Sequence, residues 1–201
     1  MTRDEVIQAF NAIRVWQNAE RRAVHKPLLV LLALSRVHAA AAPTMDWNEA
    51  EPLLKALLEE FGPDGSAGTR HYPFWHLQTD GLWQLQGPPA ILSRPAAATP
   101  TLTELRQNHV RGGFTAPVYA ALKADADLVA AVAQRIVAAH FPDSIRGDVL
   151  AAVGLTPVEV WDVPKDPLRR RDPAASGCVF AASGASGVQS KKGIDCLAYK
   201  V

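Results

Sequence analysis

Residues 28–37 read LLVLLALSRV, the most apolar stretch of a chain of 201 residues. A helix over this stretch would be apolar nearly all round, so we predict that it forms the buried centre of the fold. Pro27 precedes it and suits the first turn of a helix, where a missing backbone N–H costs nothing. The stretch is far shorter than the roughly 20 residues of a membrane span, and the chain starts without a signal-peptide pattern. We therefore expect a soluble, cytoplasmic protein.

Further helices are predicted on both sides of this stretch. Capping patterns, in which a side chain satisfies free N–H groups of a first turn, start at Thr2, Asp46 and Thr101. Apolar residues at helical spacing extend the first of these helices as far as Trp16, and the second runs to about Phe61. More helices are expected at about 115–123, at 125–140 and from 143 up to Gly154.

One piece of β-structure is predicted as well. Residues 72–77 and 82–85 flank Asp80-Gly81, a dipeptide typical of tight turns between antiparallel strands. Alanine is abundant and runs of β-branched residues are short, which favours helices elsewhere. The sequence thus predicts an α+β protein: a mainly helical single domain with one β-hairpin, followed by a linker and an irregular C-terminal tail.

The composition changes after Thr156. A charged segment with three consecutive arginines, 161–171, is followed by residues 174–193, which are rich in Ala, Ser and Gly and have no hydrophobic period. Such compositions are typical of linkers and tails. We predict one domain at residues 1–156 and a basic linker and Ser/Gly/Ala-rich tail at residues 157–201.

The sequence contains no complete set of residues for catalysis or for cofactor binding. The two cysteines, Cys178 and Cys196, are eighteen positions apart in the tail, and no histidine follows His140, so a metal site lacks ligands. There is no nucleotide-binding glycine loop and no Gly-x-Ser-x-Gly motif. We expect no catalytic residue, no metal and no cofactor.

Charge alone does not indicate a nucleic-acid-binding protein, because 21 basic residues face 20 acidic ones and the net charge is +1. Any such surface has to come from local clusters. The first cluster lies where the buried helix begins and consists of Arg21, Arg22, His25, Lys26 and Pro27. Helix N-terminal amides and the helix dipole favour an anion there. A solvated turn is the alternative interpretation.

The second cluster is the aromatic run with basic flanks, RHYPFWH, at residues 70–76. Phe74 is expected in the core, with Trp75 as a further candidate, because strand residues alternate faces. Tyr72 and Pro73 are better placed to form a shallow apolar surface. Beside a cationic patch, such a surface suits a ligand that is anionic and partly soft.

The third cluster is Arg106, Gln107, Asn108, His109 and Arg111. Arginine pairs well with guanine edges, and Asn or Gln with adenine edges, in the major groove of DNA. An ordinary polar helix end is the alternative. Gly112-Gly113 after it is interpreted either as a flexible turn or as a backbone contact to phosphate.

Two motifs at this spacing resemble a known family. They are Arg-x-x-His-Lys-Pro-Leu-Leu at 22–29 and Tyr-Pro-Phe-Trp-x-Leu at 72–77, with DGLW at 80–83 and VRGGF at 110–114. Together, over about residues 1–170, they are similar to the sulfur-binding domain of McrA-type modification-dependent restriction endonucleases. That family reads DNA in which sulfur replaces one non-bridging phosphate oxygen.

The resemblance implies a partner, double-stranded phosphorothioate DNA, and two sets of residues. The sulfur pocket would comprise His25, Lys26, Pro27, Tyr72, Pro73 and His76. Contacts to the surrounding DNA would come from Arg21, Arg22, Arg70, His71, Gln107, Asn108, His109 and Arg111. A nuclease domain or a second copy of the chain is a possible further partner. The HNH nuclease domain that follows in such endonucleases has no complete counterpart in 157–201, so we expect a reader that does not cleave DNA alone.

Three alternatives remain open at this point. The chain could bind DNA through its sequence or through methyl groups, since the same basic clusters would serve. It could be an HNH-type nuclease whose catalytic part is truncated or unrecognised. It could also be a protein-interaction module in which the exposed aromatic residues dominate binding.

Overall fold

The computed structural model describes residues 1–15, 23–95 and 97–155. The predictions for Trp16, Arg21, Arg22 and the tail at 157–201 lie outside these residues. Within them the chain is mostly helical with a small antiparallel sheet, so the predicted α+β class is confirmed. No described helix is both long enough and apolar enough to cross a membrane.

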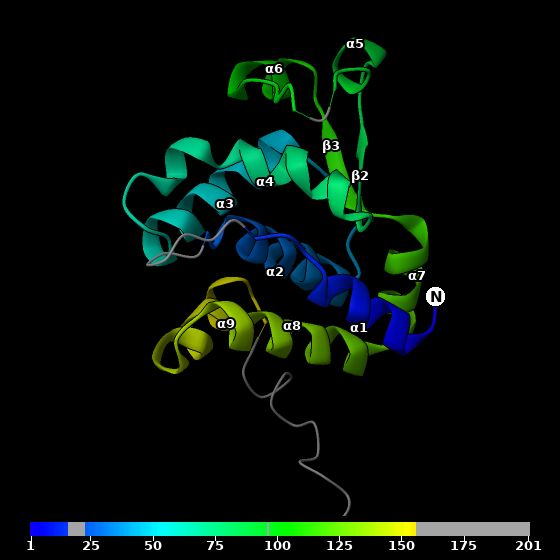
Figure 1. Cartoon of the computed structure of the whole chain (residues 1–201), viewed down its shortest axis with the longest axis vertical. Coiled ribbons are helices and arrows are strands. Elements are labelled where there is room, and N and C mark those ends of the chain that lie inside the picture. Colours follow the sequence, from blue (N-terminus) through cyan, green and yellow to red (C-terminus); the bar gives the residue numbers. More distant parts are fainter. Residues whose placement is uncertain (16–22, 96, 156–201) are drawn as a thin grey trace, which may run out of the picture. The chain divides into compact units, whose positions relative to one another are not determined.

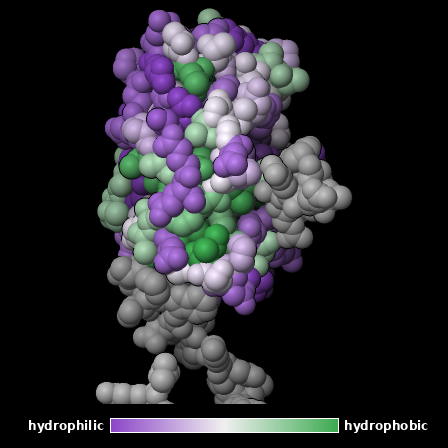
Figure 2. Space-filling model, turned by 90° about the vertical axis from the view of Figure 1, so that its left-hand side faces the viewer, coloured by the Kyte–Doolittle hydropathy of each residue, from purple (hydrophilic) through white to green (hydrophobic). Residues whose placement is uncertain are grey.

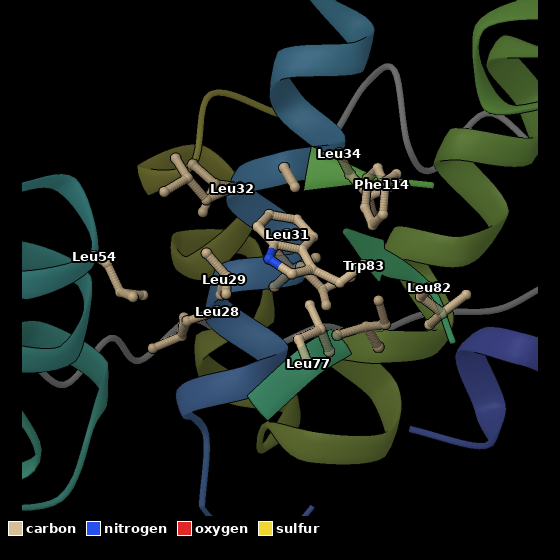
Figure 3. Packing of buried hydrophobic residues seen from close by; sticks show 14 of the residues in the cluster. Leu28, Leu29, Leu31, Leu32, Leu34, Leu54, Leu77, Leu82, Trp83 and Phe114 are labelled. Atoms are coloured by element: carbon tan, nitrogen blue, oxygen red, sulfur yellow. The ribbon is translucent and has the colours of Figure 1, made fainter. Parts of the chain in front are cut away.

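The predicted buried helix is the centre of the fold. Helix α2 (His25–His38) includes the apolar stretch, and Leu28, Leu29 and Leu31 are fully buried. Helices α3 (Trp47–Phe61) and α4 (His71–His76) contact it, as do α7 (Ala116–Ala124) and α8 (Ala126–His140). In Figure 1, α3 and α4 lie on one side of α2 and α8 on the other. Figure 3 shows leucines pointing outward from α2 all around its axis, as its sequence predicts.

Two further helices pack against α8. Helix α1 (Arg3–Asn11) packs on α7 and α8, and α9 (Arg146–Ala152) packs on α8 and α3. The capping box of α1 is formed as predicted, with Thr2 accepting from the Glu5 N–H. The helix ends at Asn11, earlier than expected. The chain then turns away, and the Arg14 N–H donates to Asp80 Oδ1 at 3.4 Å.

Of the predicted hairpin, the second strand forms, as β2 (Trp83–Gln86), but the first strand is wrong. Residues 71–76 form α4, and a 3₁₀ turn, η2 (Leu77–Asp80), continues it to Gly81. The physical reason is burial: Pro73, Phe74 and Trp75 are all buried, whereas consecutive strand residues point to opposite faces. Pro73 also lies in the first turn of the helix. A backbone N–H at that position would have no helical acceptor, so proline costs no hydrogen bond there.

The sheet is built from three distant segments instead. Its order is β1 (Thr44–Asp46), β3 (Arg111–Phe114), β2 (Trp83–Gln86), and both pairings are antiparallel. The segment between β2 and β3 contains α5 (Pro89–Leu92) and α6 (Leu102–Gln107), and Thr101 and Glu104 form a capping box for α6. Strand β1 was not predicted, because three residues are too few to show an alternating pattern.

The Gly112-Gly113 segment, interpreted above as a flexible loop, is the central strand of this sheet. A Cβ at Gly112 would lie 2.7 Å from Phe74 Cζ, and one at Gly113 would lie 2.0 Å from the Pro43 carbonyl oxygen. Trp83 packs edge-on against both Phe74 and Phe114. The glycines therefore allow aromatic rings and a neighbouring strand to approach the backbone closely.

Most large apolar side chains are covered. Among the described residues, the large apolar side chains that remain exposed are Met1, Leu53 and Tyr72. Figure 2 shows one face of the molecule, with hydrophilic residues over most of its upper part and some exposed hydrophobic surface lower down. Tyr72, which lies on α4, belongs to the candidate site.

Candidate functional site

A pocket of about 390 Å³ opens where the start of α2 meets α4. It is lined by Arg14, Val15, Ala23, His25, Lys26, Thr69, Tyr72, Pro73 and His76. Three segments of the sequence, 14–15, 23–26 and 69–76, thus supply one concave surface. The structure brings together five of the six residues predicted for the sulfur pocket. The exception is Pro27, which is buried in α2.

Four residues of the lining were missed at the sequence level. Arg14 and Val15 follow α1, whose end was placed too late, and Ala23 and Thr69 carry no distinctive chemistry. Arg14 is exposed at the pocket, so it adds a basic residue that no motif had singled out. The chain that follows α1 runs toward Asp80, to which the Arg14 N–H donates, and this brings Arg14 to the pocket.

The ammonium group of the pocket has a buried partner. Lys26 Nζ lies 2.6 Å from Asp80 Oδ2, and the Asp80 side chain is 1% exposed. Asp80 follows α4 in the 3₁₀ turn, where the sequence had suggested only a hairpin turn. The positive charge expected from Lys26 is therefore largely compensated inside the protein.

His25 adds a neutral wall. Its Nε2 lies 3.0 Å from the Ser66 carbonyl oxygen and 3.1 Å from Thr69 Oγ1. Burial lowers the pKa of His25 below its ordinary value, and the Ser66 carbonyl opposes this only in part. At neutral pH the imidazole is uncharged, so its role is shape and polarity and not charge.

The α4 side of the pocket is mainly ring surface. Tyr72 is 47% exposed and meets the rings of His71 and His76 edge-on, with centroids 4.6 and 6.0 Å apart. Pro73 is buried beneath it. His76 Nε2 lies 2.8 Å from Thr99 Oγ1, and burial, together with the charge of Lys26, lowers the pKa of His76. These groups offer a weakly polar surface with a compensated cation beside it.

Arg70 and His71, predicted to contact DNA, are partly buried at the start of α4. Arg70 donates to Glu51 Oε1 through Nε and Nη2, at 3.0 and 2.6 Å, and to the Ala67 carbonyl oxygen through Nη1. Burial is the main reason that the pKa of His71 is lowered, and Arg70 lowers it further. In the described part of the chain, Nδ1 of His71 is buried without a hydrogen-bond partner. All three nitrogens of the Arg70 guanidinium thus donate to groups of the protein itself.

The third cluster lies where α6 leads into β3. Gln107, His109 and Arg111 are exposed, and Asn108 donates to the Glu104 carbonyl oxygen. His109 adopts a φ of 46°, and its Nδ1 lies 3.4 Å from Asp46 Oδ2. Arg111 is anchored by Thr44, which accepts from it through both the hydroxyl and the carbonyl oxygen. The polar side chains are thus presented on a short, well-anchored segment.

Fold and pocket together define a small, mainly helical domain with a partly apolar binding pocket between two helix starts. Comparison with known families is decisive: residues 3–158 match the ScoMcrA-like DNA sulfur-binding domain. The chain belongs to this family, as the two motifs had indicated. A search of curated proteins finds no match.

Solved structures share the fold. The sulfur-binding domain of ScoMcrA complexed with phosphorothioated DNA has a TM-score of 0.65 and 24% identity, over 74% of this chain and 94% of that chain. The corresponding domain of SprMcrA, also with phosphorothioated DNA, has a TM-score of 0.64 and 20% identity, over 77% and 95%. The type IV phosphorothioation-dependent restriction endonuclease ScoMcrA has a TM-score of 0.61 and 23% identity, over 75% of this chain and only 28% of that chain. The similarity therefore covers one domain of that endonuclease.

Proposed function

We propose that this chain binds double-stranded DNA containing a phosphorothioate linkage, and that the pocket between α2 and α4 holds the sulfur atom. It would serve as the targeting part of a modification-dependent restriction system, acting on DNA in the cytoplasm. Membership of the DNA sulfur-binding family supports the ligand class. The observation that best supports the site is the convergence of His25, Lys26, Tyr72, Pro73 and His76 on one pocket.

The chemistry of the pocket suits sulfur better than oxygen. A phosphate oxygen is strongly hydrated, and burying it without hydrogen-bond donors costs about 1–3 kcal/mol or more. In this pocket the Lys26 ammonium already pairs with Asp80 and His25 is neutral, so these two groups offer little compensation to a buried oxygen. Sulfur is larger, more polarisable and less well hydrated, and gains dispersion contacts with the rings of Tyr72 and Pro73.

Affinity for the rest of the DNA would come from the surrounding cations. Basic residues that neutralise phosphates give sequence-independent, salt-dependent binding. Arg14 and Arg111 are exposed beside the pocket and in the third cluster, respectively. Arg21 and Arg22 keep their predicted role, and Gln107, Asn108 and His109 are proposed to contact neighbouring bases or backbone.

A direct binding titration tests the proposal. One short duplex is prepared unmodified and with a single phosphorothioate of each stereochemistry, and binding is followed by fluorescence anisotropy. In the proposed complex only one non-bridging position would face the pocket, so strong binding to one stereoisomer is expected. Equal binding to all three forms would indicate a general DNA binder. Absence of binding in several base contexts would favour a protein-interaction module.

A further inference from the structure

The buried carboxylate of Glu51 holds two arginines from different helices. Glu51 lies on α3 with a side chain that is 9% exposed. Arg70, at the start of α4, and Arg106, on α6, both donate to it. The hydrogen bond from Arg106 is the main reason that the pKa of Glu51 is lowered, so the carboxylate remains charged. The cluster consists of one buried anion and two cations.

The two arginines are not equivalent. The Arg70 side chain is 13% exposed and uses all three guanidinium nitrogens on Glu51 and the Ala67 carbonyl oxygen. The Arg106 side chain is 46% exposed and places Nε and Nη2 on the Glu51 carboxylate. Among the residues that the structure describes, its Nη1 has no hydrogen-bond partner. Arg106 thus presents one edge of a fixed guanidinium to the surface.

We propose that Arg106 contacts a DNA phosphate outside the sulfur pocket, and that Glu51 is the positioning residue that holds Arg106 for this contact. The proposal rests on the function proposed above. Through Arg70, Glu51 also bonds to the first turn of α4, which supplies Tyr72 and Pro73 to the pocket. Glu51 therefore connects the start of α4 with Arg106 on α6.

Simple electrostatics and positioning make opposite predictions for Glu51→Gln. The substitution removes a negative charge close to the proposed phosphate, so charge alone would strengthen binding. If Glu51 instead holds the Arg106 side chain in its binding geometry, Glu51→Gln leaves that side chain flexible in the free protein. DNA binding then has to order it, which costs binding free energy. We expect Glu51→Gln to weaken binding about three- to tenfold, on the scale of ordering one such side chain.

The experiment is a double-mutant cycle read by fluorescence anisotropy on the full chain, with the phosphorothioate duplex and its unmodified counterpart. The variants are Glu51→Gln, Arg106→Gln and the double variant, with Glu60→Gln as control, because Glu60 is an exposed carboxylate of the same helix. Arg106→Gln should also reduce the dependence of log K on log salt by about one unit. In the Arg106→Gln background, Glu51→Gln should have no further effect on affinity.

The outcomes separate the proposals. If the wild-type chain shows no preference for the phosphorothioate duplex, the proposed function fails first. If it does, and Glu51→Gln binds as well as wild type or better, the positioning role is overturned. A merely structural role would disturb α4 and change the ratio of sulfur to oxygen affinity, whereas positioning weakens both equally. Should Glu51→Gln unfold in a thermal melt, Arg106→Gln and Arg106→Lys still decide whether Arg106 contributes a salt-dependent contact.

Discussion

Lys26 Nζ and Asp80 Oδ2 lie 2.6 Å apart, and the Asp80 carboxylate is almost completely buried behind the pocket. In the proposed sulfur pocket, the Lys26 cation is therefore not free to bind any phosphate. Its charge is compensated before the ligand arrives. This pairing gives a physical reason for a preference between two ligands of the same net charge.

Asp80→Asn should weaken that preference. With an amide in place of the carboxylate, the Lys26 ammonium becomes available to a phosphate oxygen, so affinity for unmodified DNA should rise several-fold. The ratio of phosphorothioate to phosphate affinity in anisotropy titrations should fall accordingly. Asp64→Asn, at an exposed loop position, is the control. An unchanged ratio in a folded Asp80→Asn variant would show that the ion pair has no part in discrimination.

Tyr72→Ala should also reduce the sulfur preference, for a different reason. The ring is half exposed in the absence of DNA, so its removal leaves the fold stable but removes apolar contact with the sulfur atom. We expect a several-fold loss of affinity for the phosphorothioate duplex and a smaller loss for the unmodified one. Tyr72→Phe keeps the ring and should keep the preference. If both variants bind equally well, the ring does not contact the ligand.

Gly113→Ala should destabilise the fold strongly. The new Cβ would lie 2.0 Å from the carbonyl oxygen of Pro43, which directly precedes β1, so β1 and β3 have to separate. We expect a loss of about 2 kcal/mol or more in urea unfolding. Gly147→Ala is the matched control, because that position lies in α9 with nothing near the new Cβ. It should be neutral or stabilising by about 0.5–1 kcal/mol.

Stability should fall as the pH is lowered from about 7.5 to about 5.5. The pKa values of His25, His71 and His76 are all lowered, chiefly by burial, from the ordinary 6.5. The unfolded chain then takes up protons at a pH where the folded chain does not, so the free energy of unfolding decreases as the pH falls through 6.5. Urea titrations at several pH values measure this slope, and His25→Gln should make it shallower. A slope of zero would mean that these imidazoles are as easily protonated in the fold as outside it.

The sequence was informative wherever a local pattern decides the structure. The apolar stretch 28–37 predicts the buried helix because it is longer than a typical strand and apolar nearly all round. Thr2 and Thr101 mark helix starts because caps act within one turn. The aromatic run at 72–77 was wrongly predicted to be a strand. A run of such residues before the turn dipeptide Asp80-Gly81 suggests a hairpin, whereas the burial of consecutive side chains fits a helix. Tertiary contacts with Gly112 and Trp83 decide that case, and they involve residues far apart in the sequence.

The site was only partly predictable for the same reason. The motifs point to His25, Lys26, Tyr72, Pro73 and His76, and these residues do meet at one pocket. Asp80, Glu51 and Arg14 act through partners at least 19 positions away, and no spacing rule connects them. Arg70 was predicted to face DNA because of its charge, whereas its geometry commits it to Glu51.

Helix α4 is six residues long, too short to persist by itself in water. Phe74 and Trp75 fasten it into the core, and the same backbone positions Tyr72 and Pro73 at the pocket. We therefore expect the pocket wall to unfold together with the core and not by itself. Ligand binding at the surface should accordingly slow hydrogen exchange of amides in the buried part of α2, beyond the residues that line the pocket.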